Sequence, residues 1–232
     1  MNEWPEVVIL VTTWCGPEER GLAEIRLEYT QKTINGLKKH FKYPNYSWHI
    51  SDNHSGQEYK DRVIAMLGDD RWTLTDLGKA VSFGKSVNVA QQAAFSHADI
   101  VAFWLDDVWL DRDLDVKSCV QLLLEDEEIG AIRLKPHQLR TEGYSINRHG
   151  RIWWRLHKDS PGGFIFTLAP NIRHKRFFET YSPYDESLFN LDHLEHSLDA
   201  NFRATPGPGI VCPEEFWSAI QIPWGPECST WL

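Results

Sequence analysis

Two stretches of the chain are apolar at almost every position, and both predict strands that are buried on two faces. Residues 7–13 form one stretch and residues 99–105 form the other. A strand with one wet face alternates apolar and polar side chains, whereas a central parallel strand is covered by helices on both sides. The sequence therefore predicts a parallel sheet with these two strands near its centre.

The segments between these strands supply the helical connections that parallel strands need. Apolar residues recur at helical spacing over 21–41, and Pro44 closes that element. Residues 46–50 alternate like a strand. Four further elements continue the alternation: helices around 59–67, 86–97 and 116–124 and a strand at 130–134. This order predicts an α/β fold of three layers with right-handed crossovers.

After residue 134 the pattern is less regular. An apolar stretch at 163–168 predicts a strand, and residues 183–200 predict an acidic helix. Residues 204–232 carry several prolines and no clear period, which predicts a tail that wraps over the surface. Because no low-complexity linker divides the 232 residues, we expect one domain.

Composition and charge narrow the class of protein. A net charge of −9 argues against general affinity for nucleic acids or anionic membranes. The four cysteines are scattered without CxxC spacing, which favours reduced thiols in a cytosolic protein. The N-terminus lacks a basic leader, and no apolar run is long enough to span a bilayer. We therefore expect a cytoplasmic protein without a transmembrane segment.

The strand at 99–105 is followed directly by two acids, Asp106 and Asp107. Open α/β sheets bind ligands at the carboxyl ends of their strands, and a carboxylate pair there can hold a hard divalent cation. Burying two carboxylates without a cation or donors is costly, so a plain acidic turn requires an exposed strand end. The pair predicts a metal-nucleotide site.

Several common nucleotide and hydrolase motifs are absent from the sequence. There is no phosphate-binding GxxxxGK loop, no GxGxxG after the first strand, no GxSxG and no HExxH. These absences argue against a P-loop kinase and a dinucleotide-dependent oxidoreductase. The acidic pair remains the strongest candidate for chemistry.

Four segments follow one another in an order that resembles a known enzyme family. The first strand ends in Thr12-Thr13, the second ends in an Asp-Asn-x-Ser turn at 52–55, the segment 84–88 opens a helix, and 99–107 ends in the acidic pair. Their order and approximate spacing resemble the GT-A glycosyltransferases, especially the large inverting family that uses nucleotide-diphosphate sugars. The resemblance implies a three-layer, Rossmann-like GT-A fold with a mostly parallel central sheet.

The same resemblance divides the expected single domain, 1–232, into parts. Residues 5–135 match the nucleotide-sugar-binding half well. Residues 136–203 match the acceptor half more loosely, mainly from residue 160 onward. Residues 204–232 are the expected C-terminal tail.

For the nucleoside, the resemblance places Thr12, Thr13 and Trp14 beneath the ligand. It lets Asp52 accept a hydrogen bond from the base, commonly uracil. An Asx-turn or a helix cap is the alternative for Asp52, since most loops of this sequence do that. The UDP-sugar is the donor that this reading favours.

For the diphosphate, the family has an Arg-Asn pair at the start of the helix before its metal motif. Asn88 matches the second member, whereas Val87 stands in place of the arginine. Lys85 is either a substitute cation near the diphosphate or a solvated surface lysine.

The family's Asp-x-Asp motif is altered in this chain. Leu105 stands where its first Asp is expected, so Asp106 is the middle residue and Asp107 the last. The resemblance implies that Asp107 is the direct ligand of Mn²⁺ or Mg²⁺. It places Asp106 against the ribose or a metal-bound water.

An inverting transferase also needs a carboxylate that takes the proton of the acceptor hydroxyl. The family's acidic motif corresponds best to Asp192, and Glu195 lies on the same face one helical turn later. The flanking Leu191 and His193 break the family's acidic doublet. A solvated acidic helix face is the alternative.

A segment rich in Trp and Arg, residues 148–155, follows the nucleotide half. Aromatic faces stack on sugars or bases, and arginines contact phosphates, so the segment is compatible with a phosphate-bearing acceptor. Such acceptors include a lipid-linked sugar, a nucleotide or DNA, and a plain glycan also remains open. The alternative is that at least one of Trp153 and Trp154 belongs to the core.

Three hypotheses follow from these motifs. The first is a metal-dependent glycosyltransferase that moves a sugar from a UDP-sugar to a hydroxyl with inversion. The second is a nucleotidyltransferase. Such enzymes generally need a Gly-rich, basic loop after the first strand, and residues 12–17 lack it. The third is a non-catalytic module on the same fold that binds a glycan or nucleic acid. The altered motifs favour this hypothesis, because an enzyme that has lost its activity would show them.

Overall fold

The computed structural model describes residues 4–16, 21–134, 142–160, 165–168 and 170–213, together with the backbone of 220–221. Its six helices are α1 (Ala23–His40), α2 (Gln57–Leu67), α3 (Phe83–Phe95), α4 (Val116–Glu125), α5 (Lys175–Tyr181) and α6 (Leu191–Ala204). Nine strands form the main sheet: β1 (Val7–Thr13), β2 (Tyr46–Asp52), β3 (Trp72–Asp76), β4 (Ile100–Leu105), β6 (Ile129–Arg133), β7 (Gly143–Arg148), β8 (Arg151–Leu156), β9 (Asn171–His174) and β10 (Gly209–Pro213). A separate two-stranded ladder pairs β5 (Trp109–Leu110) with β11 (Ile220–Gln221).

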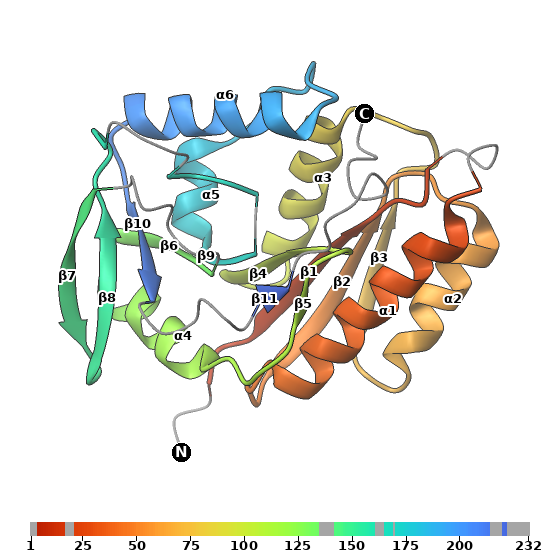
Figure 1. Cartoon of the computed structure of the whole chain (residues 1–232), viewed down its shortest axis with the longest axis horizontal. Coiled ribbons are helices and arrows are strands. Elements are labelled where there is room, and N and C mark those ends of the chain that lie inside the picture. The colour runs from red at the N-terminus through yellow and green to blue at the C-terminus, as the bar shows by residue number, and fades with distance from the viewer. Residues whose placement is uncertain are drawn as a thin grey trace.

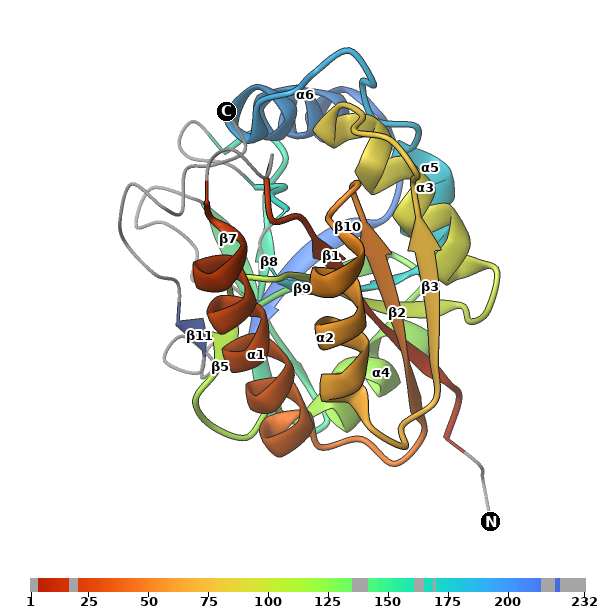
Figure 2. The ribbon, with the colours of Figure 1, turned by 90° about the vertical axis from the view of Figure 1, so that its right-hand side faces the viewer.

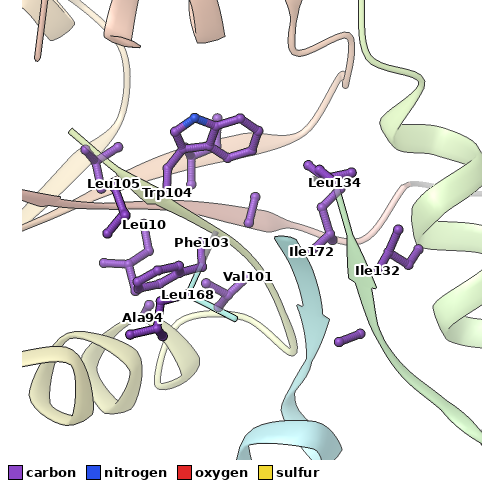
Figure 3. Packing of buried hydrophobic residues seen from close by; sticks show 14 of the residues in the cluster. Leu10, Ala94, Val101, Phe103, Trp104, Leu105, Ile132, Leu134, Leu168 and Ile172 are labelled. Carbon is purple, nitrogen blue, oxygen red and sulfur yellow. The ribbon is translucent and has the colours of Figure 1, made fainter. Parts of the chain in front are cut away.

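The two predicted apolar strands lie side by side in the middle of the sheet. The strand order is β3-β2-β1-β4-β9-β6-β10-β8-β7, and β1 pairs in parallel with both β2 and β4. Every residue of β1 and β4 is buried. Figure 3 shows side chains of β4, including Phe103 and Trp104, packed with Leu10 and Ile172 of neighbouring strands. The prediction of a mostly parallel α/β sheet is confirmed.

Helices cover the sheet on both faces. Helices α1 and α2 pack together on one face, while α3 crosses the other face of β1, β2 and β4 (Figure 2). This arrangement follows from right-handed crossovers, because the chain moves from β1 outward to β3 and then returns through α3 to β4 on the other side of β1. The carboxyl ends of β1, β2 and β4 therefore meet at one edge.

The prediction for residues 163–168 is wrong where the structure describes it. Residues 165–168 form no strand, and residues 163–164 lie outside the described residues. The strand of this region is β9, which runs antiparallel between β4 and β6 (Figure 1). The buried Arg173 interrupts its apolar pattern, and its guanidinium donates hydrogen bonds to Gln91 and Tyr184. A charged residue inside a buried strand hides it from a search for apolar runs.

The expected surface tail, 204–232, contains a central strand. Strand β10 lies between β6 and β8, and all five of its residues are buried. Its apolar run is only Ile210-Val211-Cys212, which is too short to show a period. The interpretation of this segment as a surface tail is therefore wrong for 209–213.

Two further elements differ from the sequence prediction for identifiable reasons. The acidic helix begins at Leu191 instead of 183, because Asn190 caps it by accepting from two backbone N–H groups. The edge strand β3 was not predicted, since it is mostly exposed and three of the five residues of its sequence, WTLTD, are polar.

Cys15, Cys119 and Cys212 are buried free thiols as expected, and Cys228 lies outside the described residues. In the part of the chain that the structure describes, no helix is long and apolar enough to cross a membrane.

Acid is expected to weaken this fold through His49 of β2. Burial lowers the pKa of His49 to about 4, and its ring nitrogens lie 2.7 Å and 3.1 Å from the Thr73 and Thr75 hydroxyls. The nearby His97 contributes to the lowering of that pKa. Because the unfolded chain takes up this proton near pH 6.5, stability falls as the pH drops from there to about 4.

The His49 contribution is about 3 kcal/mol over that range, of which about 2 kcal/mol is lost by pH 5. Thermal unfolding of wild type and His49→Gln at pH 7.5 and pH 5 measures it. The glutamine variant is expected to lose less stability on acidification. An equal loss in both proteins would contradict this account of His49.

Candidate active site

The carboxyl ends of β1 and β2 are tied together beneath the surface. The Thr13 hydroxyl donates to Asp52 Oδ2 at 2.8 Å, and the Ser55 backbone N–H donates to Asp52 Oδ1 at 2.6 Å. Thr12, Thr13 and Asp52 are at most 1% exposed. Burial raises the pKa of Asp52, and these hydrogen bonds oppose that rise. Asp52 thus makes the turn that was its alternative, and it ties the ends of β1 and β2 together.

Asp106 lies deeper than expected from its place after β4. Its carboxylate is fully buried, pairs with Arg26 of α1, and accepts from the Trp14 backbone N–H at 3.4 Å. The Thr33 hydroxyl holds the Asp106 carbonyl at 2.9 Å. Burial raises the pKa of Asp106, and Arg26 is the main group that lowers it. The Asp106 carboxylate is therefore buried at the strand end and engaged by groups of the protein itself.

Asp107 is the member of the pair that reaches the surface. Its residue is 7% exposed, and its Oδ2 accepts from Arg26 Nη1 at 3.2 Å. Among the described residues, its Oδ1 has no hydrogen-bond partner. One oxygen of Asp107 is thus anchored and the other is available to a ligand.

Arg26 is the residue at this strand end that sequence reasoning missed. It is 1% exposed, and its guanidinium contacts both acids. Removing one partner of a buried ion pair costs about 3–5 kcal/mol, because the other charge is left uncompensated. The signal was present: two acids after a buried strand require a cation, and Arg26 occurs in a helix that must pack against that strand.

A cleft of about 710 Å³ opens beside these strand ends. It lies between the end of β1, the loop after β2 and the first turns of α2. Its walls include Trp14, Cys15, His54, Gln57, Tyr59 and Arg62. Arg62 pairs with Glu24 at 2.5 Å, and Glu58 also lines the cleft, so the walls are not cationic. The volume is typical of small-molecule sites, and the lining suits a neutral aromatic ligand better than an anion.

A second groove, of about 730 Å³, lies away from the strand ends. It contains Lys42 and Arg151 together with Asp113 and Asp115. Arg151 pairs with Asp115 at 2.5 Å, and Lys42 lies 3.8 Å from Asp113. Because these charges compensate one another and this groove does not lie at the carboxyl ends of parallel strands, the cleft at Trp14 is the better candidate site.

The start of α3 is built to receive the segment 184–188. Asn88 Oδ1 accepts from the Tyr184 backbone N–H at 2.8 Å, and Asn88 Nδ2 donates to the Tyr184 carbonyl at 3.0 Å. Gly84 lies so close to this segment that an added Cβ would overlap the Asp185 carbonyl oxygen. The Asn88 amide is therefore engaged within the protein. Lys85, by contrast, is exposed at the helix start.

The acids of α6 divide into two kinds. Glu195 Oε1 accepts from the Leu168 backbone N–H at 2.7 Å, and Asp199 Oδ1 accepts from Ile165 and Phe166 at 2.8 Å and 3.0 Å. These two acids hold the loop 165–168 in place. Asp192, in the first turn, is exposed, and its carboxylate has no partner in the described parts of the chain.

The Trp/Arg segment forms the hairpin β7–β8. Trp153 is fully buried and donates to the Arg148 carbonyl at 3.3 Å, so it belongs to the core. Trp154 is half-buried. Arg155 pairs with Glu128 at 2.9 Å, which compensates its charge. The alternative of a core tryptophan is confirmed for Trp153.

The described residues contain no group of three or more His, Cys, Asp or Glu side chains arranged around a common metal position. Asp107 can nevertheless offer one carboxylate oxygen at the strand end. Mg²⁺ commonly takes one or two carboxylates and completes its shell with substrate phosphates and water. The donor set therefore fits a divalent ion that is shared with a phosphate ligand.

Comparison with known proteins places the fold. No protein-family model and no curated protein matches the sequence. The 1–349 portion of S. aureus TarS in complex with UDP-GlcNAc aligns with a TM-score of 0.65 and 15% identity, over 97% of this chain and 61% of that one. A mannosyltransferase from Pyrobaculum calidifontis, in complex with GDP-Man and Mn²⁺, gives 0.61 and 15%, over 93% and 56%. GalNAc-T7 with UDP, GalNAc and Mn²⁺ gives 0.64 and 9%, over 98% and 45%.

At these identities the likeness is one of fold, and it confirms the GT-A fold expected from the ordered motifs. The chain spans less than two thirds of the length of each of these three proteins. Fold analogy alone does not fix an activity, which has to be argued from the site.

Proposed function

We propose that this protein is a metal-dependent glycosyltransferase that uses a nucleotide-diphosphate sugar, with a UDP-sugar as the first candidate. The observation that carries the proposal is Asp107, a carboxylate after β4 with one anchored and one available oxygen. The cleft of about 710 Å³ opens at the end of β1, the strand that pairs with β4. The GT-A neighbours were solved with UDP-GlcNAc, GDP-Man or UDP, and two of them with Mn²⁺. A nucleotide-sugar is therefore the ligand class that fits both the site and the fold.

The walls of the site support a division of the donor into two parts. The base and ribose would enter the cleft, where Trp14 offers an aromatic face and Gln57 offers a donor and an acceptor. The diphosphate would lie over Asp107 and within reach of a cation such as Lys85. Asp52 and Asp106 would act from below by fixing Thr13 and Trp14.

A divalent ion bound through Asp107 would neutralise the charge that develops on the departing diphosphate. The residues of the chain would do the rest. Asp192 would take the proton of the acceptor hydroxyl as that oxygen attacks the anomeric carbon from the face opposite the diphosphate. Attack from that face would give inversion. Glu195 and Asp199 would keep the neighbouring loop fixed through its backbone N–H groups.

A panel of nucleotides tests the proposal. Thermal unfolding would be measured with UDP, GDP, CDP, TDP and their sugars, each with and without Mn²⁺. We expect UDP or a UDP-sugar to raise the melting temperature, with a larger shift when Mn²⁺ is present. If no member of the panel shifts the transition under either condition, the proposal is wrong.

A binding module without catalysis is the second candidate. Its support is that Asp106 is neutralised by Arg26 and that Asn88 is engaged by Tyr184, so two motif positions serve the fold. Such a module would bind its ligand without transferring sugar, and the binding would survive Asp107→Ala and Asp192→Ala. A nucleotidyltransferase would instead release pyrophosphate from a nucleoside triphosphate. Slow hydrolysis or transfer of a UDP-sugar that requires Asp107 favours the transferase over both.

A further inference from the structure

One positive charge is built permanently into the acidic strand end. Arg26 Nη2 donates to Asp106 Oδ1, and Arg26 Nη1 donates to Asp107 Oδ2 at 3.2 Å. The guanidinium sits on α1 and is 1% exposed. Its burial and these two ion pairs hold it at the acidic pair.

The other groups around Asp106 are neutral donors. They are the Trp14 backbone N–H and, at 3.5 Å, the hydroxyls of Thr30 and Tyr59. Two carboxylates and one guanidinium thus leave one net negative charge at the pair. Asp52 is the next nearest acid that Asp106 senses, and it has its own donors in Thr13 and Ser55.

We propose that Arg26 is an internal counter-cation that sets how tightly the Asp107 site binds a divalent ion. The inference rests on the proposed function in taking Asp107 as the metal ligand. Arg26 neutralises negative charge that would otherwise attract a cation from solution, and it binds one of the two Asp107 oxygens. The ion alone consequently binds weakly. Binding becomes tight when a nucleoside diphosphate brings its own oxygens and negative charge to the same place.

A charge cycle at the pair tests this inference. The pair and residue 26 carry one net negative charge in wild type and none in Asp106→Asn. The double variant Arg26→Met/Asp106→Asn returns to one negative charge, and Arg26→Met alone has two. The dissociation constant for Mn²⁺, measured by electron paramagnetic resonance of the free ion without nucleotide, should follow this order. We expect at least about a tenfold change for each unit of charge.

The double variant is the informative one. If Arg26 is purely structural, the affinity for Mn²⁺ should not depend on the net charge of the pair and residue 26. If Arg26 is a counter-cation, adding Arg26→Met to Asp106→Asn should restore the Mn²⁺ affinity that Asp106→Asn loses. Arg26→Met leaves the buried Asp106 carboxylate without its partner, so Mn²⁺ alone should raise the melting temperature of this variant more than that of wild type. If Arg26→Met does not fold, the other three proteins still decide the question.

Arg151→Met is the matched control. It removes another Arg–Asp pair, the one with Asp115, which lies away from the strand ends. Its Mn²⁺ affinity should equal that of wild type. Transfer from a UDP-sugar by wild type is measured in parallel, so that the two proposals fail separately. Equal Mn²⁺ affinity in wild type, Asp106→Asn and the double variant, beside active wild type, would overturn the role of Arg26 and leave the transferase standing.

Discussion

Asp107→Ala is expected to lower kcat/KM for sugar transfer about 10²- to 10³-fold and to abolish the part of UDP binding that depends on Mn²⁺. Asp107 is the strand-end acid with an oxygen that has no partner in the described residues. Removing it deprives the ion of its carboxylate. The remaining Arg26–Asp106 pair is complete, so the fold should persist. Steady-state kinetics over a range of Mn²⁺ concentrations, with thermal unfolding alongside, measures both effects.

Asp113→Asn provides the control for a change of charge. Asp113 is an exposed acid on the loop after β5, where it pairs with His40 at 2.8 Å. Its substitution removes the same charge from the surface without touching the strand end, and kcat/KM should stay within about twofold of wild type. An Asp107→Ala protein that is folded and transfers sugar at the wild-type rate would refute the assignment of Asp107.

The sheet and its strand-end acids were accessible to sequence reasoning because their signals are local. The runs that became β1 and β4 are apolar at almost every position, and the pair Asp106-Asp107 follows β4 directly in the sequence. A buried parallel strand needs nothing beyond its own side chains to be recognised. The position of the site at the carboxyl edge then follows from the architecture alone.

What sequence reasoning missed depends on contacts between distant residues. Arg26 reads as a surface position of an amphipathic helix, and only its pairing with acids 80 and 81 positions later explains its burial. Arg173 likewise breaks the pattern of β9, because its partners Gln91 and Tyr184 are not visible locally. A buried charge is stabilised by partners elsewhere in the chain, so periodicity carries no information about it.

The roles within the site also depended on depth, which a sequence does not give. Thr12 and Thr13 were expected beneath the ligand and Asp52 against its base, and all three side chains are buried at the strand ends. The residues that line the cleft, such as His54 and Gln57, come from the loop after β2 and the start of α2. Motif order predicted the edge of the sheet at which the cleft opens, and Trp14 of the motif lines that cleft together with side chains of the neighbouring loop.

The two acids proposed for α6 should separate cleanly by experiment. Asp192→Asn is expected to lower kcat about 10²- to 10⁴-fold with an unchanged melting temperature, because its exposed carboxylate would be the proton acceptor and contributes no contact in the described structure. Glu195→Ala should lower the melting temperature instead. It leaves the buried Leu168 backbone N–H without its acceptor, at a cost of about 1–3 kcal/mol.

Glu195→Gln sharpens that comparison, since it keeps a carbonyl oxygen for the Leu168 N–H and removes only the charge. If Glu195 holds the loop, the glutamine variant should regain most of the stability and rate that the alanine variant loses. If Glu195 were the base, glutamine would be as inactive as alanine. Glu179→Gln, an exposed acid on α5, controls for charge. A folded Glu195→Gln protein without transfer, beside an active Asp192→Asn protein, would exchange the two assignments, because only the proton acceptor must be ionised.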